Sequence, residues 1–301
     1  MKRIKVNKKL YSISSSFTQY MLLSSYQVME RNSSEEVSEM KKYPLVLGLL
    51  ALISLGASNQ LVQAAPQADY EVLAQYERDD RWFTQGLEVS PEGQLLMSTG
   101  QYGDSVVGVL NLETGQLEVK DRLDRQVFGE GLTQTPDAVW QISYKEGLAY
   151  KRDPKTLAIL ETFHYEGEGW GLAYDASRDS LWMTNGSTKL QERDAKNFEL
   201  KREVTVTDQG KPIKWLNELE FVDGKLYGNI WQSPFIVKLD PETGVIESQY
   251  DFTTLIKEHK LEAQLTPGGK PDVLNGIAHI EGDRFYVTGK YYPYVFEVRL
   301  K

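Results

Sequence analysis

Cysteine is absent from the 301-residue sequence, and histidine occurs only three times. Without cysteine there are no disulfide bonds, so the fold depends on a hydrophobic core, which a chain of this length can supply. His164, His259 and His279 are too widely spaced for a typical zinc site. No Asp-rich loop has the spacing of a calcium site, although a carboxylate site for calcium stays open. We therefore expect no metal ion and no other cofactor.

The sequence also lacks an excess of positive charge and a long hydrophobic run. Residues 1–64 hold eight Lys or Arg and four Asp or Glu, so the remainder holds 26 basic and 39 acidic residues. An acidic body argues against nucleic acid or anionic lipid as a partner. The apolar run Leu45–Leu55 is shorter than the roughly 20 residues that a membrane span needs. We expect no nucleic-acid binding and no membrane anchor in the mature protein.

The same apolar run has the flanks of an export signal. Met40-Lys41-Lys42 precedes it, and Val62-Gln63-Ala64-Ala65 follows it. A basic start, a short apolar stretch and small residues at a cleavage point are typical of a secretory signal peptide. We predict that residues 40–64 are this signal, cut near Ala64, and that the protein is periplasmic or extracellular. Residues 1–39 are polar and Ser-rich, which favours an untranslated or disordered extension over a long signal start.

A short motif recurs five times in the rest of the chain. Each copy has a polar or aromatic residue, usually a glycine, and then an alternating strand. The copies are Gln85-Gly86-Leu87, Glu130-Gly131-Leu132, Trp170-Gly171-Leu172, Asn217-Glu218-Leu219 and Asn275-Gly276-Ile277. Their second positions are 45, 40, 47 and 58 residues apart. A repeat of about 40–50 residues indicates the blades of a propeller.

Further strands follow each motif in the same order. In the first unit they are predicted at Leu95–Thr99, Val106–Leu112 and Leu117–Arg122, separated by turn residues. The fifth unit ends at its third strand, Tyr294–Lys301, and Tyr70–Tyr76 is a spare strand that could complete it. Residues 65–301 are therefore predicted to form one all-β domain. It is a five-bladed β-propeller with four antiparallel strands per blade, closed by the N-terminal strand.

An insertion at residues 253–274 interrupts the last repeat. Leu255, Ile256, His259 and Leu261 have a spacing compatible with one helix over Thr253–Ala263. Pro267-Gly268-Gly269 then ends the regular pattern. We expect a surface elaboration over one face of the ring, with a lid as the alternative.

The first strand of each propeller blade lines the central channel. The residues that start the five motifs should therefore point toward one shared mouth: Gln85, Glu130, Trp170, Asn217 and Asn275. Amides, a carboxylate and an aromatic ring converge there. Strands that only packed against one another would carry aliphatic residues instead. The pattern therefore predicts a site for a small ligand.

Seven segments of the chain resemble one family in order and over about residues 70–300. They are Phe83-Thr84-Gln85-Gly86-Leu87, Phe128-Gly129-Glu130-Gly131-Leu132, Gly169-Trp170-Gly171-Leu172, Leu216-Asn217-Glu218-Leu219-Glu220, Asn229-Ile230-Trp231, Asn275-Gly276-Ile277-Ala278 and Thr288-Gly289-Lys290. They look like the motifs of plant- and bacterial-type glutaminyl-peptide cyclotransferases. The resemblance implies a five-bladed propeller that converts the N-terminal glutamine of peptides or proteins to pyroglutamate and releases ammonia, without a metal ion. We expect a monomer.

The reaction requires one group that accepts a proton and then donates it. The substrate amine attacks its own γ-carboxamide, loses a proton, and ammonia leaves protonated, so one carboxyl group can serve both steps. Glu130 is the channel-facing carboxylate, and the resemblance also implies an acid/base there; the alternative is a structural Glu that accepts backbone amides. Glu218 is a second acid, which would hold the substrate ammonium or brace Lys290.

The developing oxyanion needs fixed hydrogen-bond donors. Gln85, Asn217 and Lys290 are candidates by position and by the resemblance, and Asn275 could share the role or be structural. The alternative for Asn217 is bonding to a strand edge, and for Lys290 it is a solvated surface charge.

Aromatic residues should wall the pocket and grip the substrate. Phe83, Trp170 and Trp231 are the candidates, with packing between blades as the alternative. Tyr144 stands where the family usually has Trp, and we expect altered affinity more than lost activity from that change. Two other functions stay open: a non-catalytic exported propeller that binds a ligand or partner at its mouth, and a metal-dependent propeller hydrolase such as a lactonase.

Overall fold

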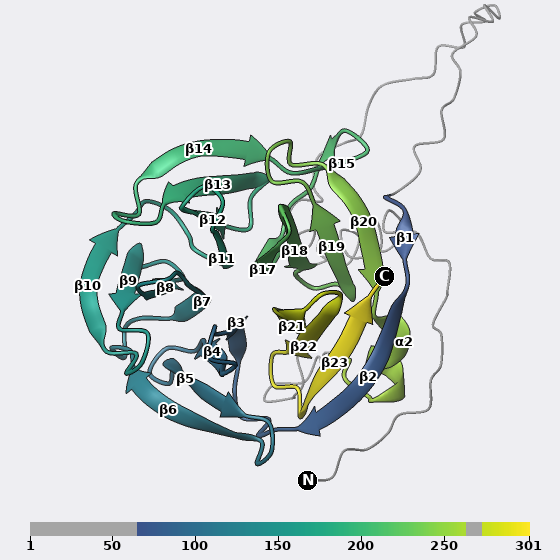
Figure 1. The fold of residues 1–301 in the computed structure, drawn as a ribbon, viewed down its shortest axis with the longest axis horizontal. Helices are drawn as coiled ribbons and strands as arrows, with labels where there is room; N and C mark the ends of the chain where they lie inside the picture. Colours follow the sequence, from purple (N-terminus) through teal and green to yellow (C-terminus); the bar gives the residue numbers. More distant parts are fainter. Residues whose placement is uncertain (1–64, 263–272) are drawn as a thin grey trace, which may run out of the picture. The chain divides into compact units, whose positions relative to one another are not determined.

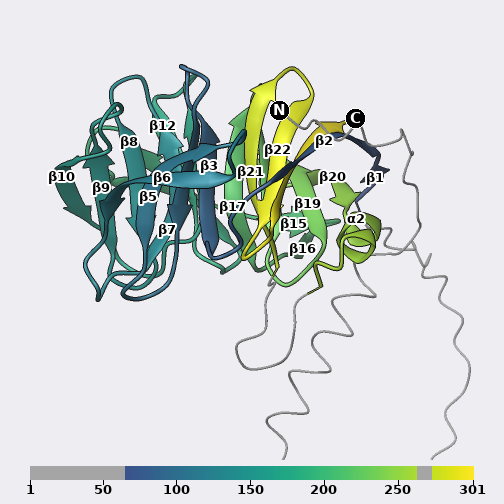
Figure 2. The same cartoon turned by 90° about the horizontal axis from the view of Figure 1, so that it is seen from below.

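The structure is a computed structural model, and it describes residues 65–262 and 273–301. These residues form five large β-sheets set around a central axis, together with one two-stranded sheet (Figure 1). Seen from the side, β3 runs along the axis while the outer β6 is strongly inclined to it (Figure 2), as the right-handed twist of a sheet requires. Among these residues no helix has both the length and the apolar character to span a bilayer. The predicted five-bladed propeller is confirmed.

Each of the first three blades is a meander of four antiparallel strands that runs from the axis outward. Blade 1 contains β3 (Thr84–Val89), β4 (Leu95–Thr99), β5 (Val106–Asn111) and β6 (Gln116–Arg122). Blade 2 contains β7 (Gly129–Gln134), β8 (Val139–Ser143), β9 (Leu148–Arg152) and β10 (Ile159–His164). Blade 3 contains β11 (Leu172–Asp175), β12 (Ser180–Thr184), β13 (Lys189–Asp194) and β14 (Leu200–Thr205).

The N-terminal segment joins the last two blades. Blade 4 contains β17 (Leu216–Val222), β18 (Lys225–Ile230), β19 (Phe235–Leu239) and β20 (Ile246–Asp251), and blade 5 contains β21 (Leu274–Glu281), β22 (Arg284–Gly289) and β23 (Tyr294–Leu300). β2 (Tyr70–Glu77) pairs antiparallel with β23, from Tyr70 opposite Leu300 to Glu77 opposite Tyr294. This confirms that an N-terminal strand closes the last blade. In addition, β1 (Gln67–Ala68) lies parallel to β20, a pairing that the repeat did not predict.

The turns between the third and fourth strands share one geometry. Asn111 and Asp240 each accept two backbone N–H groups on their side-chain Oδ1, from the residues two and three positions later. Asp153 accepts the same pair of bonds in blade 2. Such Asx turns fix the chain reversal locally. The repeated Asp and Asn residues in the sequence therefore mark repeated structure.

The repeated glycines mark where inner strands of neighbouring blades touch. A methyl group on Gly171 would lie 2.0 Å from the carbonyl oxygen of Asn217, and one on Gly131 would lie 2.7 Å from that of Trp170. The backbone N–H of Gly131 donates to the carbonyl of Trp170 at 2.8 Å. Only glycine permits this approach of backbone to backbone. The repeated glycines of the motif are therefore explained by close packing of the inner strands at the centre of the ring.

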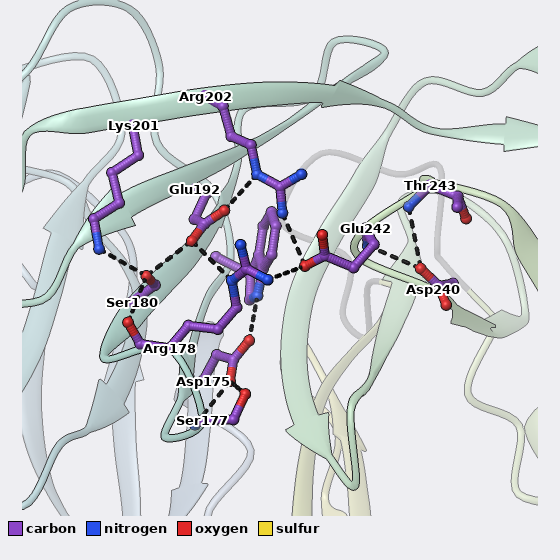
Figure 3. Close-up of polar contacts among 11 residues, drawn as sticks. Asp175, Ser177, Arg178, Ser180, Glu192, Lys201, Arg202, Asp240, Glu242 and Thr243 are labelled. Carbon is purple, nitrogen blue, oxygen red and sulfur yellow. Dashed lines mark hydrogen bonds and ion pairs between the residues drawn. The ribbon is translucent and has the colours of Figure 1, made fainter.

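Large apolar side chains fill the spaces between blades. Trp140 of blade 2 stacks on Phe198 of blade 3 with 5.3 Å between ring centroids, and both are buried. Each fully buried large side chain contributes about 1.5–3 kcal/mol to folding. Between blades 3 and 4 the outer contact is charged instead: Glu242 accepts hydrogen bonds from Arg178 and Arg202 (Figure 3).

Three segments outside the regular blade strands differ from the sequence predictions or lie beyond what the structure describes. Within its described residues the insertion forms one six-residue helix, α2 (Thr253–Glu258). This helix ends before the predicted Ala263, because Lys260 adopts a left-handed φ of 56°. A two-stranded hairpin of β15 (Thr207–Asp208) and β16 (Lys211–Pro212) was not predicted. The predicted signal and extension at residues 1–64 lie outside the described residues.

Candidate active site

The candidate residues gather at one face of the ring because of strand direction. Gln85, Glu130 and Asn217 lie at the starts of inner strands. Lys290 and Trp231 directly follow the second strands β22 and β18. Adjacent strands in each blade are antiparallel, so the start of a first strand and the end of a second strand meet at the same edge. The topology therefore brings both groups to one mouth.

Glu130 is buried and is held by a relay of amides. The residue is 4 % exposed. Nε2 of Gln85 donates to Oε1 of Glu130 at 3.0 Å. Nδ2 of Asn275 in turn donates to Oε1 of Gln85 at 3.3 Å and to the carbonyl of Thr84 at 3.0 Å. Asn275 thereby fixes the amide of Gln85 so that an N–H faces the carboxyl group.

Burial raises the pKa of Glu130 well above its ordinary value. The positive charge of Lys290 opposes the rise, whereas the negative charges of Glu146 and Glu168 add to it. Removing a carboxylate from water disfavours its charged form, which explains the direction. A carboxyl group with a raised pKa can both accept and return a proton near neutral pH.

Lys290 is buried beside this carboxyl group. It is 5 % exposed, and its ammonium lies 4.7 Å from the centre of the Phe83 ring. The alternative of a solvated surface charge is therefore wrong. The turn that carries Lys290 is held by the buried Arg78, which donates to the carbonyls of Gly289 at 2.8 Å and Tyr292 at 2.7 Å. Burial lowers the pKa of Arg78 to about 10.

Two groups of aromatic rings stand around the mouth. On one side Phe83 contacts Phe128 with ring centroids 6.0 Å apart, and Phe128 contacts Tyr144 at 5.7 Å. On the other side Trp170 and Trp231 meet edge to face at 5.6 Å. All five aromatic residues are half-buried, so part of each stays accessible to a ligand. They can enclose a small flat group from opposite sides.

Asn217 supplies an unused acceptor. Its backbone carbonyl accepts the hydroxyl of Thr184 at 2.7 Å. Its side-chain Oδ1, however, is buried and has no hydrogen-bond partner within the described part of the chain. A buried acceptor without a donor is costly unless a ligand supplies one. Asn217 is therefore placed to receive an N–H group from a bound molecule.

Glu218 has a different setting from the other candidates. It takes the glycine position of the motif in blade 4, and its two carboxylate oxygens accept the backbone N–H groups of Leu87 at 3.1 Å and Ile277 at 2.8 Å. It thus ties the inner strands of blades 1, 4 and 5 together. This geometry favours a bracing role across the ring centre, and contact with substrate stays a prediction.

The sequence motifs missed several residues of the mouth. Tyr291 packs on Phe83 at 5.0 Å, Tyr102 on Phe128 at 5.3 Å, and Trp215 on Trp231 at 6.1 Å. Glu146 accepts the hydroxyl of Tyr102 at 3.0 Å. Tyr291 directly follows the motif residue Lys290, which was the available clue. Residues 65–262 and 273–301 contain no group of three or more His, Cys, Asp or Glu side chains arranged to hold a metal ion.

Comparison with known proteins finds relatives in sequence and in fold. The glutamine cyclotransferase family matches residues 14–300. A glutaminyl-peptide cyclotransferase of Arabidopsis thaliana is 32 % identical over 237 residues, covering 77 % of this chain and 72 % of that protein. The crystal structure of Myxococcus xanthus glutaminyl cyclase shares 33 % identity with a TM-score of 0.70, covering 77 % of this chain and 96 % of that one. The match extends over all five blades and the mouth they form, and the chain therefore belongs to the glutamine cyclotransferase family.

Proposed function

We propose that this protein converts the N-terminal glutamine of peptides and proteins to pyroglutamate with release of ammonia. The observation that carries the proposal is the buried carboxyl of Glu130, which accepts a hydrogen bond from Gln85 at a mouth walled by aromatic rings. Membership of the family and the activity for which both relatives are named support it.

In this mechanism Glu130 shuttles one proton. The α-amine of the substrate glutamine attacks its own δ-carbon, so a C–N bond forms and the amine hydrogen passes to the carboxylate of Glu130. The carboxyl group then returns that proton to the amide nitrogen, the old C–N bond breaks, and ammonia leaves. Because the carboxyl is unchanged after both transfers, one residue is enough. The raised pKa of Glu130 makes both directions accessible near neutral pH.

The other residues orient the substrate and stabilise charge. Lys290 and the second N–H of Gln85 are donors for the oxyanion. The free Oδ1 of Asn217 is an acceptor for an N–H of the substrate amine or amide. Phe83 and Tyr144 on one side, and Trp170 and Trp231 on the other, hold the side chain folded over the amine, which fixes the reactive conformer.

An ammonia-release assay on a glutamine-initiated dipeptide tests the proposal, with the asparagine-initiated dipeptide as the matched control. We expect turnover of the first and none of the second, because a four-membered ring would have to form. Turnover that survives a chelator separates the cyclotransferase from a metal-dependent hydrolase. Saturable binding of the dipeptide without ammonia release would favour the non-catalytic binding protein and overturn the proposal.

Export and assembly complete the proposal. The basic start, the apolar run Leu45–Leu55 and the small residues before Ala65 support export to the periplasm or the medium. We expect the exported protein to be a monomer. Cell fractionation and sedimentation of the recovered protein test these two points. Protein that stays in the cytoplasm, or that sediments as a dimer, would contradict them separately.

A further inference from the structure

Ala65 is buried against an acidic side chain that the mouth does not use. It is 3 % exposed, and its backbone nitrogen donates to Oδ1 of Asp208 at 3.0 Å. Asp208 is itself 7 % exposed and lies on β15, in the small hairpin between blades 3 and 4. A contact between residues 143 positions apart thus ties the N-terminal segment to that hairpin.

The chain after Ala65 is fixed to blade 4. The carbonyl of Pro66 accepts the N–H of Gln249 at 3.0 Å, and β1 then runs parallel to β20 (Figure 1). Pro66 also restricts the preceding residue to extended backbone. The nitrogen of Ala65 is therefore held in one place, directed at the carboxylate of Asp208.

We propose that Asp208 is the receptor for a mature N-terminus at Ala65, whose α-ammonium forms a buried ion pair with its carboxylate. The proposal rests on the export proposed above. Hydrolysis of the Ala64–Ala65 peptide bond breaks one C–N bond. The oxygen of a water molecule joins the Ala64 carbonyl carbon to give a carboxylate, and the nitrogen of Ala65 becomes an amine that takes up a proton near neutral pH. Val62 and Ala64 supply the small residues that such a cleavage uses.

The charge balance at Asp208 favours an ammonium over an amide N–H. Burial raises the pKa of Asp208, and the hydrogen bond from Ala65 and the charge of Lys211 only partly oppose this. A charged donor makes a shorter and roughly twofold stronger hydrogen bond to a carboxylate than a neutral N–H does. Processing at Ala65 therefore converts a poorly compensated buried carboxylate into a paired one.

The position of the Ala65–Asp208 ion pair links processing of the N-terminus to closure of the ring by β2. The segment from Ala65 to Glu77 contributes β1 to blade 4 and β2 to blade 5, so it bridges the two blades. Thr207, next to Asp208, forms a bridge to Val245 in the turn before β20. An ion pair at Asp208 holds the start of this segment against blade 4, on which its pairing with β20 depends.

The test begins with the full chain produced in an export-competent bacterium. N-terminal sequencing of the recovered protein should read Ala-Pro-Gln-Ala-Asp. Thermal unfolding of this protein and of its Asp208→Asn variant is then followed from pH 6.5 to pH 9.5. We expect the variant to melt about 4 °C or more below the wild type at pH 6.5, and the deficit to fall to less than half by pH 9.5.

The sign follows from the amine. An α-amino group has a pKa near 8 in an unfolded chain, and a carboxylate partner raises it in the folded state. Its stabilisation is complete below pH 8 and is lost as the pH rises through the folded pKa. The other titratable groups on the elements that meet here are Lys211 on β16, Glu247, Tyr250 and Asp251 on β20, and Asp69 after β1. Carboxylates and lysines titrate outside this window in model peptides, and burial raises the pKa of Tyr250 to about 12.

Two controls separate the outcomes. Asp175→Asn removes a buried carboxylate whose donors are neutral, the N–H and O–H of Ser177 and the indole N–H of Trp182, so its deficit should not change between pH 6.5 and 9.5. Leu49→Arg, which disrupts the apolar run, should keep the leader attached. In that chain Asp208→Asn should show no pH dependence in the same window.

Three results would overturn the proposal. A different N-terminus in exported protein refutes the processing site at Ala65. A deficit for Asp208→Asn that stays constant with pH in correctly processed protein refutes the ion pair while leaving export intact. If Asp208→Asn does not fold, the processed wild type is compared with the unprocessed Leu49→Arg chain. The proposal requires the processed protein to lose stability more steeply than that chain between pH 8 and 9.5, and equal slopes would refute it.

Discussion

The side-chain nitrogen of Gln85 lies 3.0 Å from Oε1 of Glu130, across the boundary between blades 1 and 2. Asn275 of blade 5 bonds to the oxygen of the same Gln85 amide, so three blades determine which way that amide points. An N–H donor stabilises the carboxylate form, while burial favours the neutral acid. These opposed effects keep both protonation states of Glu130 within reach, which a proton shuttle requires.

Replacing Glu130 by Gln should abolish most of the activity and leave the fold intact. The side chains have nearly the same shape, and Gln can still accept the hydrogen bond from Gln85. The loss of general acid/base catalysis should lower kcat by about 100-fold or more. Ammonia release from a glutamine-initiated dipeptide measures the rate, and near-ultraviolet circular dichroism checks the fold. Turnover within tenfold of the wild type would refute the role of Glu130.

Two charge-removing substitutions should move the pH profile in opposite directions. Lys290 lowers the pKa of Glu130, so Lys290→Met should shift the acidic limb of kcat/KM to higher pH. Glu146 raises that pKa, so Glu146→Gln should shift the limb to lower pH. The substrate amine also titrates, but it is common to all variants, and the differences report the enzyme. Lys151→Met serves as control, because this lysine lies near the end of the third strand β9, at the edge of blade 2 opposite the mouth, where it bonds Asp137.

The test of these two substitutions depends on the pH at which the acidic limb of kcat/KM falls, not on the absolute rates. Lys290 is also a candidate oxyanion donor, so its variant should be slower at every pH. The position of the limb is the informative quantity. Shifts of Lys290→Met and Glu146→Gln in the same direction, or no shift in either, would contradict the electrostatic account of Glu130.

The ring could be predicted from the sequence because its determinants are local and repeated. Gly131 and Gly171 recur where backbones of neighbouring blades touch, and Asp153 and Asp240 recur in the same Asx turn. Each feature needs a particular residue type for a reason that acts within a few positions. The spare strand at residues 70–76 then followed from the count of strands in the last blade.

The features that the sequence did not reveal depend on non-repeated contacts. Tyr291 reaches Phe83 because it adopts a left-handed φ of 58°, which no pattern in the sequence indicates. β1 has only two residues and pairs in parallel with β20, so it has no alternation to detect. Glu218 was a candidate to hold the substrate ammonium or to brace Lys290, yet its carboxylate accepts backbone N–H groups from two other blades.

Acidic side chains at the other end of the channel should make stability depend on pH. Glu88 lies by a cavity of about 440 Å³ that is also lined by Glu220 and His279. Burial raises the pKa of Glu88 to about 7, against hydrogen bonds from Thr133 and Gln134. The folded state therefore binds more protons than the unfolded chain between about pH 4.5 and 7. This contribution to stability is present below pH 4.5 and is lost as the pH rises to 7.

Glu88→Gln should remove that contribution, since the amide oxygen can still accept the hydroxyl of Thr133, which lies 2.8 Å from the carboxylate. As the pH rises from 4.5 to 7, the free energy of unfolding of the wild type should fall relative to that of the variant. Above pH 7 the difference between the two should stay constant. Urea unfolding at a series of pH values measures it. A difference that is flat across this range would mean that Glu88 is ionised throughout.

The charged contact between blades 3 and 4 contains one buried and one exposed carboxylate (Figure 3). Glu192 has 4 % of its side chain exposed and accepts hydrogen bonds from Arg178, Arg202 and Ser180. Glu242 binds the same two arginines but is 47 % exposed. Burial acts to raise the pKa of Glu192, yet the bonds from Arg202, Ser180 and Arg178 outweigh it and lower the pKa.

These settings predict unequal effects for the same substitution. Glu192→Gln leaves buried donors without their charged partner and should cost about 2 kcal/mol or more, whereas Glu242→Gln should cost less than about 1 kcal/mol because water screens the pair. Since the folded pKa of Glu192 is depressed, its contribution is present above the unfolded pKa and is lost as the pH falls through the folded value. The two variants should therefore differ in free energy of unfolding at pH 7, as urea unfolding measures it, and this difference should become smaller toward pH 3. Equal costs at pH 7 would show that the exposed and buried carboxylates hold the blades together to the same extent.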